Sequence, residues 1–329
     1  MLTRSFFAEY KKSYGPRVRA SGLYLLSRQH LPTERAAEAM GDLLGVDCST
    51  GFLDDVYREG ADALGPFLDE VQRQLRGSPV VHFDETPTRV KKAKHYFHVA
   101  STDLLTLLHA DVTRGLDAVE RVGVLPGYTG TAIHDRLGMY FNYKKARHGV
   151  CGAHLIRNLS SVAVVSDQTK WATAMADLLI EMKTAAEGAR AAGRKRLSHK
   201  ALASYFKRYD TIVEMGLAAN PEPEGRKRDY MEKESYNLAC ALRDLKNEVT
   251  LFAKDIAVPF SNNQAESDLR MAKLQQKISG SFRSVKGAER LATVRSYIST
   301  ARKHGIDAMD VLTALFAGEP WMPPAPMRT

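Results

Sequence analysis

The chain of 329 residues has few cysteines and no cysteine pattern. Its three cysteines, Cys48, Cys151 and Cys240, are far apart and odd in number. Domains stapled by disulfides carry dense, even sets of cysteines, so the sequence argues against a disulfide framework and favours a reducing compartment. With 44% hydrophobic residues, the chain can bury a core without such staples.

Long apolar runs are also missing. No run approaches the roughly 20 residues that a membrane helix needs. The stretch MLTRSFFAEYKKSYGPRVR mixes charges with its apolar residues and lacks the apolar core and small-residue cleavage site of a signal peptide. No internal repeat is visible, and only residues 319–329, EPWMPPAPMRT, have the composition of a disordered tail. The sequence therefore predicts a cytoplasmic protein with no membrane partner.

Acidic residues are outnumbered. The 47 Lys and Arg residues exceed the 38 Asp and Glu residues, which gives a formal net charge of +9. A basic balance favours a polyanionic partner, and nucleic acid is the commonest one.

Residues 1–76 are predicted to form a helical N-terminal region, because apolar residues recur there at spacings of three and four. Within it, a helix that begins at Thr33, a turn and a second helix capped by Ser49 or Thr50 have the outline of a helix-turn-helix. Simple packing of two helices explains this outline as well. The acids of the second helix, including Asp54 and Asp55, would repel phosphate groups.

Strand patterns follow in residues 77–164, the first part of the predicted core. The runs VVHFDET, YFHVAST and LLTLLHADV are separated by turn-forming residues and suggest an antiparallel meander. A helix over 116–122 and short strands at TAIHD and HGVCG come next.

Helical patterns then return. A helical insertion is predicted over 165–255, broken by the polar loop LAANPEPEGRKRD. Residues 256–318 complete the core, with helices from Asn262 or Asn263, from Lys286 and from Asp307. Asparagine and aspartate are typical helix caps. This order predicts an α/β fold, a mixed sheet with flanking helices.

Three acids in this scheme are candidates for one metal site. Asp84 follows the strand-like run 79–83, Asp135 follows 131–134, and Glu266 lies near the start of a helix. Carboxylates with open coordination positions suit magnesium, and two divalent cations stabilise the charge that grows when a phosphodiester is attacked in line. Each acid alone also fits a solvated cap. Other acids remain alternatives on spacing alone: Glu85, Asp103, Asp111 and Asp268.

Further polar residues accompany these acids. His154 and Arg157 are one helical turn apart and are candidates for contact with the scissile phosphate. Cys151 and His154 supply only two of the four ligands of a structural zinc site, so zinc is not expected. If the first strand alternates, His82 shares a face with Asp84.

A basic track follows Glu266. Between Arg270 and Lys303 only Glu289 opposes nine cationic residues. Such a track would hold the DNA backbone without regard to sequence. The residues of the track expected to bind DNA are Arg270, Lys273, Lys277, Arg283, Lys286 and Arg290. Two more basic clusters, at 194–196 and 226–228, lie in the insertion.

Four strings of the sequence resemble the signature blocks of a known family: VVHFDET, AIHDRLGMYFNY, HGVCGAHLIRNL and FSNNQAESDLRMAKLQQKISGSFRS. They are similar to bacterial transposases of the insertion sequence 66 family, and the likeness runs from about Tyr14 to Gly318. The resemblance implies a ribonuclease-H-like core with an Asp, Asp, Glu triad on Asp84, Asp135 and Glu266, and a helical insertion before the Glu.

The chain departs from the family pattern in places. Ser261 stands where many relatives have Asp, Ser267 where many have Arg, and Gly152 where many have Asn. Fuller relatives also carry a Cys-rich zinc-binding segment and more DNA-binding helices before the core.

The sequence thus predicts a DDE-type transposase that cleaves DNA and transfers strands with Mg²⁺ or Mn²⁺, two ions in all. Its expected partners are the ends of the insertion sequence and target DNA, a second copy of the chain when two ends are synapsed, and accessory proteins; its expected place is the bacterial nucleoid. The alternatives are a truncated, inactive DNA-binding remnant or regulator, and a general nuclease of the same fold.

Overall fold

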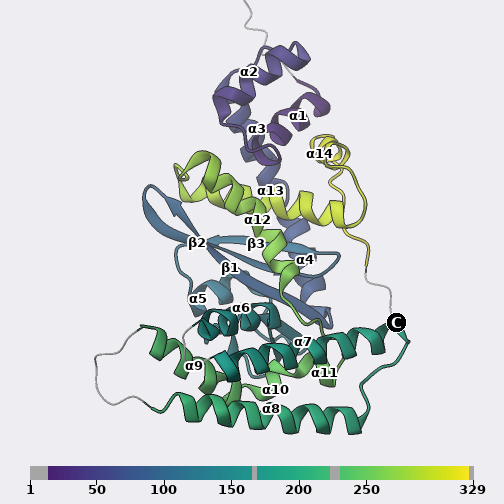
Figure 1. The fold of residues 1–329 in the computed structure, drawn as a ribbon. Coiled ribbons are helices and arrows are strands. Elements are labelled where there is room, and N and C mark those ends of the chain that lie inside the picture. Colours follow the sequence, from purple (N-terminus) through teal and green to yellow (C-terminus); the bar gives the residue numbers. More distant parts are fainter. Residues whose placement is uncertain (1–13, 165–168, 223–229, 326–329) are drawn as a thin grey trace, which may run out of the picture.

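A mixed sheet lies at the middle of the molecule, with the N-terminal helices at one end and a layer of helices at the other (Figure 1). The structure, a computed structural model, describes residues 14–164, 169–222 and 230–325. No helix in these ranges is both long enough and apolar enough to cross a membrane.

The sheet has five strands in the order β3-β2-β1-β4-β5. The first three pair antiparallel, which confirms the predicted meander, and β4 and β5 join them in parallel. Their bounds are β1 Val80–Val90, β2 Ala93–Ser101, β3 Thr106–Asp111, β4 Thr131–His134 and β5 Arg147–Val150. This mixed sheet with flanking helices is consistent with the predicted ribonuclease-H-like fold.

Strand β1 runs further than the sequence predicts. The expected strand ended at Asp84, but pairing with β2 continues from Asp84 opposite Val99 to Val90 opposite Ala93. Lys91 and Lys92 close this hairpin with positive φ angles of 47° and 70°. Two-residue hairpin turns with positive φ usually contain Asn or Gly, so the two lysines did not indicate a turn here. Asp84 is therefore inside a strand.

Helices cover both faces of the sheet. On one face lie α4 (Gly65–Gly77) and α5 (Leu116–Val122), and on the other α12 (Asn263–Ser279) packs on β1 and β2. Helix α13 (Val285–Lys303) follows the edge strand β3, where the Leu108 N–H donates to Ser296 Oγ at 2.8 Å and the Thr106 N–H to Thr300 Oγ1 at 3.0 Å. Side chains of α13 thus satisfy backbone donors that an open edge would expose.

The N-terminal helices pack against the C-terminal ones. They are α1 (Pro16–Ser27), α2 (Thr33–Leu44) and α3 (Thr50–Asp62), and α14 (Ala308–Phe316) lies beside α1. Ser49 caps α3 as predicted, because its Oγ accepts the Phe52 N–H at 3.1 Å. One apolar cluster contains Leu23 and Val56 together with Val81 of β1, so these helices share a core with the sheet.

Residues between β5 and α12 form the helical layer at the bottom of Figure 1. Its helices are α6 (Gly152–Ala163), α7 (Thr169–Ala191), α8 (His199–Ala219), α9 (Tyr230–Asp244), α10 (Lys246–Val249) and α11 (Leu251–Lys254). They bury a second apolar cluster around Trp171 and Tyr209. Helices α7 to α11 fall within the predicted helical insertion, whereas α6 belongs to the part predicted as core. The cluster at 226–228 lies outside the described residues, and the domain boundaries stay a prediction.

Candidate active site

Asp84 and Asp135 lie side by side where β4 ends. Strands β1 and β4 run parallel with His82 opposite Ile133, and each aspartate comes two residues later in its own chain segment. The expectation that the two strands are neighbours is therefore confirmed. Asp84 is only 9% exposed, whereas Asp135 is half-buried.

The carboxyl group of Asp84 is in an environment that disfavours its charge. Burial, then the neighbouring charges of Glu85 and Asp135, raise its pKa to about 7, although the Glu85 N–H donates to Oδ1 at 2.9 Å and Lys273 acts in the opposite direction. Within the described residues neither Asp84 nor Asp135 has an ion-pair partner. A buried carboxylate beside a second one favours either a proton or a bound cation.

Asn262 fixes the start of α12 to β1. This fully buried residue donates from Nδ2 to the Phe83 carbonyl oxygen at 2.8 Å, and its Oδ1 lies 2.9 Å from His82 Nδ1. Since Nδ2 is the donor to Phe83, Oδ1 accepts the proton of His82 Nδ1. The Glu266 N–H donates to the Asn262 carbonyl oxygen at 3.2 Å, so Glu266 lies in the first turn of a helix anchored one residue before Asp84.

The role predicted for Asn262 needs a correction. Helix α12 begins at Asn263 with Asn262 in the capping position, as the sequence suggests, but the Asn262 side chain makes no capping hydrogen bond. The amide nitrogen and the amide oxygen of the side chain are both hydrogen-bonded to residues of β1. The sequence indicated where the helix starts and missed what this side chain holds together.

Glu266 faces the first turns of α6. Its Oε1 lies 3.2 Å from His154 Nδ1 and 3.3 Å from a terminal nitrogen of Arg157. His154 and Arg157 therefore share a helix face, as their spacing predicts, and both are directed at this carboxylate. The ligand atoms of Cys151, His154 and Glu266 lie within 4.8 Å of one another. Among the described residues it is the one such group, so the structure does not bring Asp84, Asp135 and Glu266 together in the same way. A structural zinc site takes four protein ligands, and this group offers three.

The alternative acids have other partners. Arg114 and the Tyr140 hydroxyl hold Glu85, Arg121 holds Asp111 through both of its oxygens, and Lys303 holds Asp268. Arg121 keeps the pKa of Asp111 well below its usual range despite burial. Asp103 is exposed. Of the acids considered from the sequence, Asp84 and Asp135 are the adjacent pair without a cation.

The sequence matches the model of one protein family. The family model described as "Transposase IS66 family" matches residues 11–290. The chain belongs to the IS66 transposase family. No curated protein matches the sequence. The match spans α1 to the start of α13 and includes Asp84, Asp135 and Glu266, and membership supports a transposase role with DNA as the partner.

The basic track of this IS66 transposase is less free than its sequence implies. Arg270, Lys273, Lys277, Arg283 and Lys286 are exposed. Arg290 instead forms an ion pair with Asp54 of α3 at 3.2 Å. Glu289 is the one acid within the stretch from Arg270 to Lys303, but Asp54 and Asp268 oppose cations of the track from outside that stretch.

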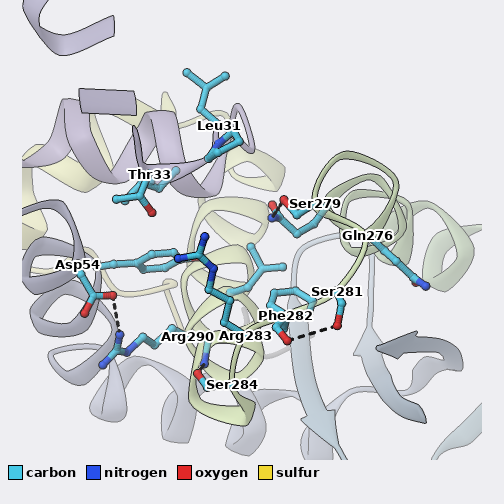
Figure 2. Close-up of a pocket in the computed structure, with 16 residues that line it drawn as sticks. Leu31, Thr33, Asp54, Gln276, Ser279, Ser281, Phe282, Arg283, Ser284 and Arg290 are labelled. Carbon is cyan, nitrogen blue, oxygen red and sulfur yellow. Dashed lines mark hydrogen bonds and ion pairs between the residues drawn. The ribbon is translucent and has the colours of Figure 1, made fainter. Parts of the chain in front are cut away.

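A groove lies between part of the N-terminal helices and the helices α12 and α13. Its volume is about 400 Å³, and residues of α2, α3 and the α12–α13 turn line it. Figure 2 shows Arg283 reaching into this groove while Arg290 turns to Asp54. The exposed part of the track thus continues into a concave surface beside the predicted helix-turn-helix, whose role in reading DNA stays a prediction.

Proposed function

We propose that this IS66-family protein cleaves DNA strands and joins the freed ends to target DNA, with Asp84, Asp135 and Glu266 as its catalytic residues. The observation that carries the proposal is the adjacent pair of a buried Asp84 and a half-buried Asp135, which have no ion-pair partner among the described residues and are joined through Asn262 to the helix of Glu266. Strand cleavage and transfer are the chemistry that a transposase needs, and no covalent protein intermediate is required.

The oxygen donors of the three acids suit divalent metal ions. Within the described residues, however, the ligand atoms that lie together around Glu266 are those of Cys151 and His154, so a bound ion would have to draw Glu266 toward the two aspartates. Carboxylate oxygens are the ligands that Mg²⁺ and Mn²⁺ prefer, and burial together with the neighbouring charges of Glu85 and Asp135 raises the pKa of Asp84. Asp84, Asp135 and Glu266 would hold the ions. Two such ions, when bound, would stabilise the charge on the attacking and leaving oxygens of an in-line displacement.

Side chains around the triad have distinct tasks in this proposal. Asp84 must lose its proton before it can act as a ligand. His154 and Arg157 restrain Glu266 through contacts at 3.2 and 3.3 Å and leave their remaining donors for a phosphate oxygen. The exposed cations from Arg270 to Lys286, with Arg290 beside them, would contact the DNA backbone irrespective of sequence.

The assembly that acts would contain at least two copies of the chain, since two element ends have to be brought together, and accessory proteins would assist it at the nucleoid. The test uses the full chain, a labelled duplex that carries the element's end, a target plasmid and Mg²⁺ or Mn²⁺. Nicked end and joined product together support the proposal. Nicking without joining would indicate a general nuclease, and binding without either product a DNA-binding remnant; both results contradict the proposal.

A further inference from the structure

A second cationic cavity lies between the end of α1 and the helices α12 and α13. Its volume is about 360 Å³, and it is separate from the groove in Figure 2. A single carboxylate, Asp268, lines it. The cationic side chains of its wall are Arg28, Arg270, Arg295, Arg302 and Lys303.

Arg295 is the unusual member of this wall. Its residue is only 3% exposed, and its Nε and one terminal nitrogen are buried with no hydrogen-bond partner among the described residues. Burial, together with the charges of Arg28 and Arg302, lowers the pKa of Arg295 to about 10. A buried guanidinium without partners is costly to the fold, so its presence calls for a ligand that satisfies it.

Arg295 forms no ion pair within the described residues, although the nearby charge of Asp268 acts to raise its pKa. Asp268 accepts a hydrogen bond from Lys303 Nζ at 2.7 Å, and both side chains are largely buried. Lys303 also donates to the carbonyl oxygens of Thr102 and Leu105, which holds this pair in place. The cavity therefore retains a surplus of positive charge.

The ligand that fits is a phosphate group. A guanidinium presents N–H donors in a planar fork that matches the oxygens of a phosphate, and the hydroxyl-bearing residues Ser267 and Ser299 also line the cavity. Ser267 directly follows Glu266, and Arg270 lies one turn further along α12. A phosphate bound here would lie against the helix that carries Glu266.

We propose that this cavity binds a backbone phosphate of the DNA strand that enters the active site, with Arg295 as its innermost ligand. The identity of the polymer rests on the proposed function, whereas the anion chemistry rests on the cavity alone. Because two of its nitrogens lie beneath the cavity surface, the guanidinium has to turn outward to bind; the phosphate then supplies the missing acceptors, so Arg295 destabilises the free protein and stabilises the complex.

That opposition separates a binding role from a structural one. Arg295→Met keeps an unbranched apolar side chain in place of the aliphatic part of arginine and removes the unpaired charge. It is expected to leave the thermal unfolding midpoint of the free protein unchanged or raise it, and to weaken duplex binding about 10- to 100-fold. The slope of log affinity against log salt should fall in magnitude by about one. Arg73→Met is the matched control, because Arg73 is exposed on α4 and its hydrogen bonds and ion pair within the described residues go to Glu70 of the same helix.

All binding is measured in an Asp84→Asn background without divalent metal, so that the result does not depend on catalysis and a failure of either proposal can be told from the other. Duplexes with a 5′ hydroxyl and with a 5′ phosphate, and inorganic phosphate alone, are the three probes. Equal weakening of both duplexes supports the backbone assignment. Two results overturn it. If only the 5′-phosphorylated duplex binds more weakly, the cavity binds a terminal phosphate. If Arg295→Met keeps its DNA affinity but inorganic phosphate no longer raises its thermal unfolding midpoint, the cavity binds free phosphate.

A second variant covers a failure to fold. Arg295→Lys keeps the charge and loses the fork, so its DNA affinity is expected to fall between those of the parent and Arg295→Met. If Arg295→Met unfolds and Arg295→Lys binds every probe like the parent, Arg295 has a structural role and the proposal is wrong.

Discussion

The side-chain amide of Asn262 donates to the Phe83 carbonyl oxygen at 2.8 Å, which ties the start of α12 to the peptide that precedes Asp84. The same amide accepts from His82. Two segments about 180 residues apart in sequence, one with the paired aspartates and one with Glu266, are thereby held in a fixed relation.

Asn262→Ala should damage both stability and catalysis. It leaves His82 Nδ1 and the Phe83 carbonyl oxygen buried without a partner, which is expected to lower the free energy of unfolding by about 2–4 kcal/mol. Denaturant titration measures this change. Asn263→Ala is the control, since Asn263 is exposed and its side chain makes no hydrogen bond within the described residues. Equal stability of the two variants would contradict the anchoring role.

Metal affinity should depend on pH through Asp84. Its pKa is raised to about 7, so below that pH a metal ion must displace a proton. The affinity for Mn²⁺ is expected to fall about tenfold per pH unit below about pH 7 and to level off above it. Calorimetric titration between pH 5.5 and 8.5 measures it. A flat profile would exclude Asp84 as a ligand with this pKa.

Without metal, the stability of the fold should depend on pH through Asp84 and should fall as pH rises. The folded-state pKa of Asp84 is above its unfolded value, so the folded protein holds this proton more tightly and loses stability as pH rises from about 4 to about 7. Asp84→Asn lacks this loss. Its free energy of unfolding relative to the parent should be higher at pH 8 than at pH 5, by about 2 kcal/mol. If the difference is the same at both pH values, the account of Asp84 is wrong.

Much of this arrangement is readable from the sequence, and the failures share a cause. The helix at 116–122, the antiparallel meander and the start of α12 are local patterns, and the structure confirms them. The extension of β1 beyond Asp84 depends on pairing with β2, and the use of Asn262 depends on β1 lying beneath α12. These are contacts between distant segments, on which local composition is silent.

The same limit applies to charge. Counting residues near Arg290 gave no partner for it besides Glu289, yet Asp54, from an N-terminal helix, binds it. The isolation of Arg295 was equally hidden, because in sequence it is one more cation of a basic helix. Burial and pairing across the fold decide which charges of the track are available.

Lys286 and Arg290 should therefore differ in DNA binding. Lys286 is exposed, whereas Arg290 is engaged by Asp54. Lys286→Met is expected to reduce the magnitude of the salt dependence by about 0.9, the value for one phosphate contact, and Arg290→Met by less. Fluorescence anisotropy with a labelled duplex over a salt series measures both slopes. A larger effect from Arg290→Met would show that its ion pair opens on DNA.

The most direct test of the central claim is metal-dependent nicking of a labelled duplex by Asp84→Asn, Asp135→Asn and Glu266→Gln, each beside its duplex affinity. The account predicts that every variant loses nicking by a factor of at least about 1,000, the scale of losing one essential catalytic group, and keeps the affinity of the parent. Nicking at the parent rate by Asp84→Asn would contradict it.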